Sequence, residues 1–463
     1  MKFTEKYSRL FQLLLPTPLS IALILSIITI IFAYIFTAPT LSDVSYVLTI
    51  LDYWERGLWN NGLLVFALQM MLILVLGHIL AMTPAVNKLI IKLTSFATNN
   101  AKAAALVCFS TVVVALFNWG LGLIFGAIIA RKVVEKALQE GINLNYPLIG
   151  AAGYSSLMVW HGGISGSSTT KVAEKNHLKE LMNGIMSPEQ IEKLPEAISF
   201  SETVFSPMNL FASCLLLILL PAVMYFLGKG KSFTTLNRLS SEEVKVETNL
   251  KPYGAEKIDY STLTTKLVGS IIILYLSVKV FNSENIQTFS FITPNFINLS
   301  LLGLGFFFHK NIMEFLKATD QAIGGASGIL IQFPLYFGIM GIMKESGLVN
   351  MLSNFFVAHS TANSFPVFTL FSAGIVNVFV PSGGGQWAIQ GPIIVQAVQD
   401  LQVSLPKSIM ALAYGDQLTN MLQPFWALPL LGITKLKAKE ILPYTLILMV
   451  VGSVIYIGTL LLF

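Results

Sequence analysis

Charged residues are scarce in this chain. Of its 463 residues, 11% are charged and 54% are hydrophobic. Soluble domains carry about 25% charged residues, so the composition excludes an ordinary soluble protein and indicates several membrane-spanning helices. The net charge of +5 is explained by basic loops on one face of a membrane. We therefore expect a lipid bilayer, and no nucleic acid, among the partners.

Cysteine and histidine are also rare, with two cysteines and five histidines in the chain. Cys108 and Cys214 both lie in apolar runs, which predicts packing residues and neither a disulfide nor a metal pair. The sequence contains no CxxC, HExxH or Walker motif. Because the spacing groups neither a nucleophile with a base nor a set of metal ligands, we expect neither an enzyme nor a bound cofactor.

Several apolar runs are long enough to cross a hydrocarbon core of about 30 Å at about 1.5 Å per residue. They are 18–36, 62–82, 206–227, 265–281, 296–309, 320–343 and 441–462. The first run follows Lys2, Lys6 and Arg9, as the core of a signal peptide would. It is longer than a typical signal-peptide core and further spans follow, so we expect a retained first helix.

Two apolar segments are folded back on themselves by turn residues. The segment 101–138 turns at Asn118–Gly122, and the segment 364–399 turns at Pro381–Gly385. Each arm is about half a membrane span. We predict two re-entrant hairpins.

Two further segments are interrupted in the middle. The segment 146–175 is broken at Gly162–Gly166, and the segment 406–432 is broken at Asn420–Pro424. Glycine and proline inside membrane sequence free backbone groups that something must satisfy, and such breaks usually line a solute site. We predict two discontinuous helices.

The hairpins and broken helices recur in the same order, which indicates an internal repeat. One common shift aligns Asn118 with Asn377, Gly126 with Gly385 and Pro147 with Pro406, and Tyr154 meets Tyr414 one residue later. The chain then divides into a first repeat (1–228), a polar cytoplasmic linker (229–264) and a second repeat (265–463).

The positions of lysine and arginine predict the orientation. With a cytoplasmic N-terminus and hairpins that do not cross, the basic clusters fall on the cytoplasmic side, at 88–102, 131–136, 229–266, 310–317 and 435–439. An odd number of crossings then separates the hairpins, so the repeats are inverted and the C-terminus lies outside. A polar insert at 174–202, with helix-like pieces, also lies outside the membrane.

Hydroxyl side chains crowd the first break. They are Ser165, Ser167, Ser168, Thr169 and Thr170. If a helix restarts there, its first amides and these hydroxyls form a site for a carboxylate. The alternative is that the hydroxyls bond back to the preceding helical turn.

The tip of the second hairpin is a second candidate for substrate binding. Ser382, Gly383 and Gly384 expose backbone close to a ligand, or else form a tight turn without one. Trp387 follows, and its ring either covers a short alkyl tail or sits at the membrane interface.

Asp416 is the most informative single residue, because a carboxylate inside a span is costly and normally pairs with a cation or binds a proton. Thr419 and Asn420, with carbonyls freed by Pro424, can complete an oxygen site for sodium. The alternative is a structural carboxylate at a helix end. His161 borders the first break and is either a titrating group or a structural one.

The chain resembles the bacterial short-chain fatty acid transporter family, on the motifs WHGGISGSS, VPSGGGQWAIQGP and GDQLTNMLQPFW and over nearly its full length. That family belongs with the ion transporter superfamily. The resemblance implies an all-α polytopic protein of the bacterial inner membrane, with a scaffold domain, a moving transport domain with two opposed hairpins, an elevator mechanism and often a homodimer. It also implies ion and substrate contacts around Asp416, Thr419 and Asn420, and makes Asn118 at the first hairpin tip a candidate ion ligand.

A monocarboxylate fits these residues, because a short acid needs one anion site and a small apolar wall. Trp160, Trp387, Phe425 and Trp426 are candidates for the wall. A dicarboxylate or phosphate favours an arginine fork, and the candidate segments contain no arginine. We expect a secondary carrier for acids such as butyrate or acetoacetate, coupled to H⁺ or Na⁺. The alternatives are a symporter or exchanger of another organic anion, and a sodium/proton antiporter.

Overall fold

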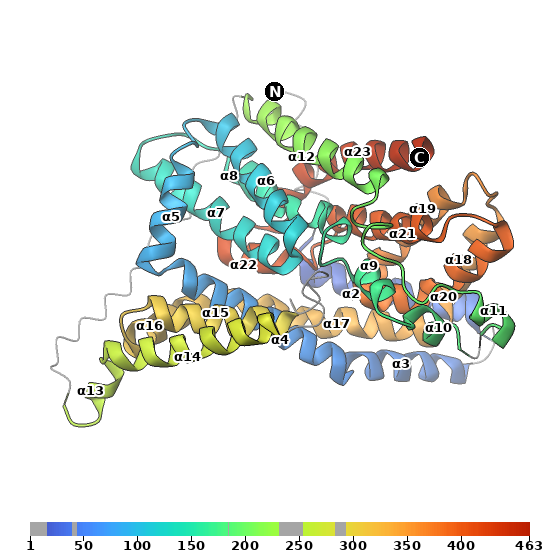
Figure 1. Cartoon of the computed structure of the whole chain (residues 1–463), viewed down its shortest axis with the longest axis horizontal. Coiled ribbons are helices and arrows are strands. Elements are labelled where there is room, and N and C mark those ends of the chain that lie inside the picture. Colours follow the sequence, from blue (N-terminus) through green and yellow to red (C-terminus); the bar gives the residue numbers. More distant parts are fainter. Residues whose placement is uncertain (1–15, 39–43, 184, 231–252, 283–292) are drawn as a thin grey trace.

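The computed structural model describes residues 16–38, 44–183, 185–230, 253–282 and 293–463, and these segments contain helices and no β-strand (Figure 1). The first half has α2 (Pro18–Thr37), α3 (Val44–Leu58), α4 (Asn61–Ala81), α5 (Pro84–Thr94), α6 (Asn100–Phe117), α7 (Trp119–Gln139), α8 (Tyr146–Tyr154), the 3₁₀ turns η1 (Ser155–Met158) and η2 (Trp160–Gly162), α9 (Ser167–Ala173), α10 (His177–Leu181), α11 (Pro188–Glu192) and α12 (Pro207–Gly228). The second half has α13 (Glu256–Asp259), α14 (Thr262–Phe281), α15 (Pro294–Phe308), α16 (Ile312–Ile323), η4 (Gly324–Ala326), α17 (Ser327–Glu345), α18 (Leu348–Ala358), α19 (Phe365–Phe379), α20 (Gly383–Leu401), α21 (Leu405–Thr419), η5 (Asn420–Leu422), α22 (Leu428–Thr434) and α23 (Ala438–Leu462).

Seven helical segments among the described residues are long and apolar enough to cross a membrane. Six of them coincide with predicted spans, namely α2, α4, α12, α14, α16 with α17, and α23. The predicted span at 296–309 falls on α15, which has 15 residues and reaches only about 23 Å at about 1.5 Å per residue. The chain is therefore a multi-pass membrane protein, although α15 is short for a complete crossing.

The seventh segment is α6, the first arm of the first hairpin, and it corrects a prediction. Helices α6 and α7 have 18 and 21 residues, so each is close to a full span in length and not half of one. The turn is also shorter than predicted. The side chain of Asn118 accepts a hydrogen bond from the backbone N–H of Leu121 at 3.0 Å, so it caps α7 and only this one residue separates the two arms.

The hairpins and broken helices occur at the predicted places. Helices α6 and α7 are followed by α8, η1, η2 and α9, and helices α19 and α20 are followed by α21, η5 and α22. The order of elements is thus the same in both halves. We call the non-α stretch 155–166 the first break and the stretch 420–427 the second break.

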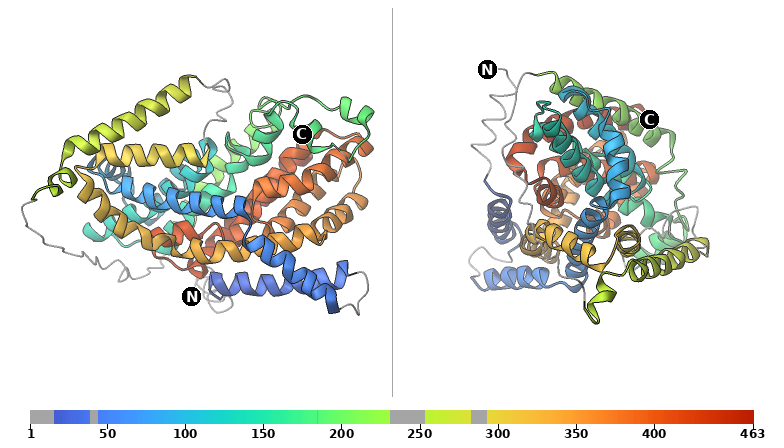
Figure 2. Two further views of the ribbon diagram at one scale, coloured as in Figure 1. Left: turned by 90° about the horizontal axis from the view of Figure 1, so that it is seen from below. Right: turned by 90° about the vertical axis from the view of Figure 1, so that its left-hand side faces the viewer.

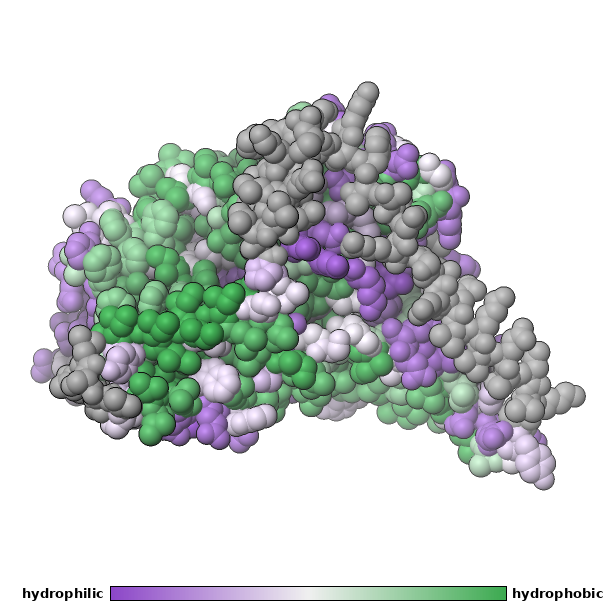
Figure 3. Space-filling view, turned by 180° about the vertical axis from the view of Figure 1, so that it is seen from behind, coloured by the Kyte–Doolittle hydropathy of each residue, from purple (hydrophilic) through white to green (hydrophobic). Residues whose placement is uncertain are grey.

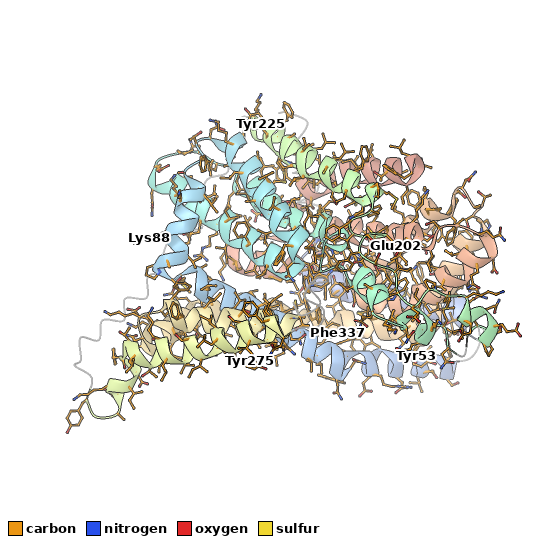
Figure 4. The ribbon with its side chains drawn as sticks, viewed as in Figure 1. Tyr53, Lys88, Glu202, Tyr225, Tyr275 and Phe337 are labelled. Carbon is orange, nitrogen blue, oxygen red and sulfur yellow. The ribbon has the colours of Figure 1, made fainter. Side chains whose placement is uncertain are left out.

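The elements form two layers (Figures 1 and 2). One layer contains the helices α3, α4, α14, α15, α16 and α17. The other layer contains the hairpins and the broken helices. On α14 the ring of Tyr275 is exposed, whereas Phe337 on α17 is buried (Figure 4). Apolar side chains also cover much of the face in Figure 3. Exposed apolar surface on this scale suits a lipid bilayer.

The insert at 174–202 contains two short helices, α10 and α11, in agreement with its helix-like pieces. It packs on the second hairpin through buried apolar side chains that include Leu178, Met182 and Leu194 of the insert and Trp387 and Val395 of α20. The insert therefore belongs to the same packed unit as the hairpin.

Much of the predicted linker, 231–252, lies outside the described residues, as do Lys2, Lys6 and Arg9. The described end of the linker contains α13, and α14 begins at Thr262. The boundary predicted at residue 264 thus falls within the first turn of α14. Thr262 and Leu263 belong to the helix because the helical pattern starts before the uninterrupted apolar run does.

Candidate substrate and ion site

The first break lies between the tips of the two hairpins. From the first hairpin, the carbonyl of Leu116 accepts the N–H of Ile164 at 2.9 Å, and the N–H of Trp119 donates to Oγ of Ser165 at 2.9 Å. From the second hairpin, Gly383 lies so close that a Cβ atom there would be 2.8 Å from the Trp160 ring and 3.0 Å from Oγ of Ser167. Both tips and the first break thus form one centre.

Three of the five predicted hydroxyls bond within the first repeat. Thr169 and Thr170 donate to the carbonyl of Gly166, at 3.2 and 2.6 Å, as in the alternative of bonding to the preceding turn. Ser165 accepts from the first hairpin, as described above. The hydroxyls of these three residues thus make hydrogen bonds that hold the break in place.

Ser167 and Ser168 have different surroundings. The hydroxyl of Ser168 lies 2.9 Å from Nε2 of His161. The hydroxyl of Ser167 makes no hydrogen bond within the part of the chain that the structure describes, and it lies against Gly383. Ser167 is therefore the hydroxyl that remains for a substrate.

The N-terminus of α20 lies beside Ser167. Ser382 caps this 19-residue helix, because its Oγ accepts the N–H of Gly385 at 3.2 Å. The amides of Gly383 and Gly384 occupy the first two helical positions, where no intrahelical acceptor exists. Gly384 is exposed, and a Cβ atom there would meet no heavy atom within 4 Å. This arrangement of donors at a long helix N-terminus suits a carboxylate.

Among the described residues, no lysine or arginine is found in contact with this group. Lys171, the nearest one in sequence, is exposed and pairs with Glu174 at 2.9 Å. The donors at the tip are therefore neutral amides and a hydroxyl. Such a group matches one carboxylate better than it matches a doubly charged anion.

Three of the predicted wall residues come together, and one does not. The rings of Trp119 and Trp160 have centroids 5.9 Å apart, those of Trp119 and Trp426 are 5.3 Å apart, and those of Phe425 and Trp426 are 5.0 Å apart. Trp387 instead donates its indole N–H to Nε2 of His177 on the insert at 3.0 Å. Trp119, which was not predicted, takes its place in the aromatic cluster.

Asp416 in the second half of the chain faces His161 in the first half. Oδ2 of Asp416 lies 3.5 Å from Nδ1 of His161, and the two side chains are 1% and 0% exposed. Neither atom has a hydrogen-bond partner among the described residues. A buried carboxylate next to an imidazole is the arrangement expected of a proton-binding pair.

The hydrogen bonds fix the tautomer of His161. Its Nε2 accepts the backbone N–H of Ser168 at 3.0 Å. A backbone N–H only donates, so Nε2 carries no proton, and a neutral imidazole must carry its proton on Nδ1. Nδ1 is the ring nitrogen that lies 3.5 Å from Oδ2 of Asp416.

The structure places Ser168, His161 and Asp416 in the order of a hydrolytic triad. The sequence could not show this, because Asp416 comes from the other repeat. Two features argue against hydrolysis. The amide of Ser168 already occupies Nε2 of His161, and Nδ1 of His161 makes no hydrogen bond to Asp416 among the described residues.

The second break holds a polar cluster around Asn377. Nδ2 of Asn377 donates to the carbonyl of Asp416 at 2.7 Å, to Oγ1 of Thr419 at 3.0 Å and to Oδ1 of Asn420 at 2.9 Å. Nε2 of Gln423 donates to the carbonyl of Asn377 at 2.6 Å. Oδ1 of Asn377 and Oε1 of Gln423 are buried without a partner among the described residues. The predicted residues Asp416, Thr419 and Asn420 thus meet in one cluster, whereas the side chain of Asn118 caps a helix.

Side chains of each half satisfy the break in the other half. The hydroxyl of Tyr154 donates to the carbonyls of Asn420 and Gln423, at 2.9 and 3.2 Å. Tyr414 donates to Oδ1 of Asn209 at 3.0 Å, and Asn209 donates to the carbonyl of Gly162 at 2.8 Å. These residues were not predicted as site residues, although the repeat alignment had matched Tyr154 with Tyr414 and Asn118 with Asn377.

The described helices and this buried polar centre define a multi-pass membrane protein whose two hairpin tips meet at a polar centre. The chain belongs to the short-chain fatty acid transporter family, because the family model described as "Short chain fatty acid transporter" matches residues 1–463. The predicted resemblance is thereby confirmed. Membership in a transporter family implies a protein that is not an enzyme.

Two curated relatives are candidate short-chain fatty acid transporters. The protein of Escherichia coli (strain K12) is 34% identical over 453 residues, which cover 97% of this chain and 96% of the relative. The protein of Haemophilus influenzae is 35% identical over 463 residues, which cover 98% and 96%.

Two solved transporters are more distant. The YdaH transporter of Alcanivorax borkumensis has a TM-score of 0.40 at 15% identity, with 98% of each chain covered. MtrF of Neisseria gonorrhoeae, which is described with a class of antimetabolite efflux pumps, has a TM-score of 0.41 at 12% identity, with 98% and 97% covered. A TM-score below 0.5 supports no conclusion about this chain.

Proposed function

We propose that this protein moves short-chain monocarboxylates, such as butyrate or acetoacetate, across the bacterial inner membrane, and that transport is coupled to protons. One observation carries the proposal. Gly383 at the start of α20 lies beside the hydroxyl of Ser167 and Cε1 of His161, and the buried carboxylate of Asp416 lies 3.5 Å from Nδ1 of the same ring.

The substrate class follows from the donors and the aromatic cluster. Neutral donors from Ser167, Gly383 and Gly384 bind one carboxylate. Trp160 borders both Gly383 and the other rings, so an alkyl tail of a few carbons packs on its face. The family and the curated relatives support the same class.

Coupling to protons follows from the repulsion between the negative charge of the substrate and that of Asp416. An anion that enters beside the first break meets the negative charge of Asp416 across the imidazole of His161. Protonation of Asp416 removes this buried charge, so proton and substrate bind better together than either does alone. The result is symport, which drives an anion into a negatively charged cell.

Sodium is the alternative coupling ion. Two buried side-chain oxygens, of Asn377 and Gln423, have no hydrogen-bond partner among the described residues. They lie beside Thr419 and Asn420 and are of the type that sodium prefers. Sodium sites of this kind occur at broken helices. A sodium-coupled symporter, an exchanger of another small organic anion and a sodium/proton antiporter remain rival functions.

The family resemblance and the element order support the rest of the proposal. The two halves are inverted repeats, with a cytoplasmic N-terminus and a periplasmic C-terminus. The hairpins and broken helices form a transport domain that moves as an elevator against the layer of α3, α4 and α14–α17. The working protein is a homodimer.

Uptake of labelled acetoacetate into proteoliposomes tests the proposal, with an imposed proton gradient in one arm and an imposed sodium gradient in the other. Accumulation above protein-free liposomes under the proton gradient supports it. Accumulation under the sodium gradient alone assigns sodium as the coupling ion. If neither gradient drives accumulation, the monocarboxylate proposal is wrong, and cation exchange without an organic substrate is the function to measure next.

A further inference from the structure

Gln417 connects the parts of the first break. It follows Asp416 on α21 and is fully buried. Its Oε1 accepts the backbone N–H of His161 at 2.8 Å and that of Gly162 at 3.3 Å. Its Nε2 donates to the hydroxyl of Tyr456 at 2.7 Å, and that hydroxyl donates to the carbonyl of Met158 at 2.6 Å.

Every orientation in this chain of hydrogen bonds is determined. Backbone N–H groups only donate and backbone carbonyls only accept. The oxygen of Gln417 must therefore face His161, and the proton of Tyr456 must point to Met158, so that Tyr456 is left as an acceptor for Nε2. The chain joins η1, which contains Met158, to η2, which contains His161, through side chains of α21 and α23.

We infer that Gln417 is a positioning residue for ion coupling, because it fixes His161 opposite Asp416 by holding the two 3₁₀ turns of the first break together. This inference rests on the proposed function. Gln417 and Asp416 are neighbours on one helix, and Gln417 holds the backbone of His161 itself. Movement of α21 therefore moves the carboxylate and the imidazole together, and the 3.5 Å approach between them is kept.

The substitution Gln417→Glu tests this inference, because its effect depends on pH. A protonated carboxyl group copies the amide: its carbonyl accepts from His161 and Gly162, and its O–H donates to Tyr456. An ionised carboxylate cannot donate to Tyr456, and it adds a second negative charge beside Asp416. Each pH unit above the midpoint raises the ratio of ionised to neutral form about tenfold.

We therefore expect proton-driven accumulation by Gln417→Glu to stay within about threefold of the wild type in acidic buffer and to fall at least about tenfold below it in alkaline buffer. Gln417→Leu loses all three hydrogen bonds of this side chain and is impaired at every pH. Tyr456→Phe is impaired as well. Ser453→Ala is the control on the same helix, since the one side-chain hydrogen bond of Ser453 among the described residues goes to the carbonyl of Met449 within α23. Its accumulation stays at the wild-type level.

A pH profile of Gln417→Glu that is parallel to that of the wild type overturns the inference, and so does full accumulation by Gln417→Leu. Thermal unfolding in detergent gives a second readout that needs no transport. The unfolding temperature of Gln417→Glu should lie below that of the wild type, and this difference should become smaller in acidic buffer. A difference in unfolding temperature that is constant with pH contradicts the hydrogen-bond chain. If the wild type and Ser453→Ala both fail to accumulate substrate, the proposed function is wrong, and the unfolding data still decide the role of Gln417.

Discussion

At the scale of single residues, the Asp416–His161 pair carries the proposed coupling. Asp416→Asn removes the proton-binding group but keeps a side chain of the same shape. We expect gradient-driven accumulation of acetoacetate to disappear, while exchange of internal for external substrate remains in part. Asp320→Asn on α16, where the side chain is exposed, is the control. Unchanged accumulation by Asp416→Asn removes this residue from the coupling role.

Gly383 is the residue at which the second hairpin touches the first break. The substitution Gly383→Ala places a methyl group 2.8 Å from the Trp160 ring and 3.0 Å from Oγ of Ser167. Such overpacking costs about 1–3 kcal/mol, so we expect uptake at low substrate concentration to fall about tenfold. Gly458→Ala on α23 meets no heavy atom within 4 Å and serves as the control. Equal uptake by the two variants would show that the tip is not held against the break.

At the scale of elements, the contact between the insert and the second hairpin depends on pH. Burial is the main cause that lowers the pKa of His177 below its ordinary value of 6.5; Lys171 lowers it further, whereas Glu174 and Glu180 raise it. Its Nε2 accepts the indole N–H of Trp387, and a protonated imidazole cannot accept. The contact is therefore complete above pH 6.5 and is lost as the pH falls from there through the lowered pKa.

The substitution His177→Phe removes this titration. The wild type should exceed it in thermal stability by up to about 1 kcal/mol in neutral buffer, which is the typical value of one hydrogen bond. The difference should shrink as the pH falls below 6.5. His359→Phe, at an exposed histidine that bonds within its own helix turn, is the control. A difference between wild type and His177→Phe that does not change with pH would contradict this account.

The elements could largely be predicted from the sequence, because clusters of glycine, proline and polar residues interrupt the apolar runs where a helix turns or breaks, whereas single prolines such as Pro221 and Pro334 lie inside helices. The breaks at Gly162–Gly166 and Asn420–Pro424 were found in this way. The helix α3 was missed, because Asp52, Glu55 and Arg56 interrupt its apolar pattern and only uniformly apolar runs indicate a span. The length of the turn in the first hairpin was overestimated. Gly120 and Gly122 suit a turn, but they lie in a helix that is capped by Asn118.

The candidate site could be predicted only in part, for a physical reason. The sequence shows which residues are costly in a membrane, such as Asp416, but not which groups satisfy them. His161 and Asp416 meet across a separation of more than half the chain, and no local pattern encodes that contact. Trp387 was assigned to the substrate because nothing in the sequence placed His177 beside its indole.

At the scale of the whole molecule, the two halves stabilise each other at the breaks, which predicts effects that cross from one half to the other. Tyr154 lies in the first half, yet its hydroxyl satisfies the carbonyls of Asn420 and Gln423 in the second. Tyr154→Phe leaves these buried carbonyls without that donor, at a cost of about 1–3 kcal/mol. We expect a lower unfolding temperature together with weaker proton-driven uptake, because the carbonyls lie in the cluster that contains Asp416.

Tyr275→Phe is the matched control for this prediction, since the ring of Tyr275 is exposed on α14. Its unfolding temperature and its uptake should equal those of the wild type. If Tyr154→Phe and Tyr275→Phe unfold at the same temperature, the tyrosine does not support the second break. If Tyr154→Phe is destabilised but transports normally, the halves are joined for stability alone, and the coupling between the breaks must depend on Gln417 and His161 instead.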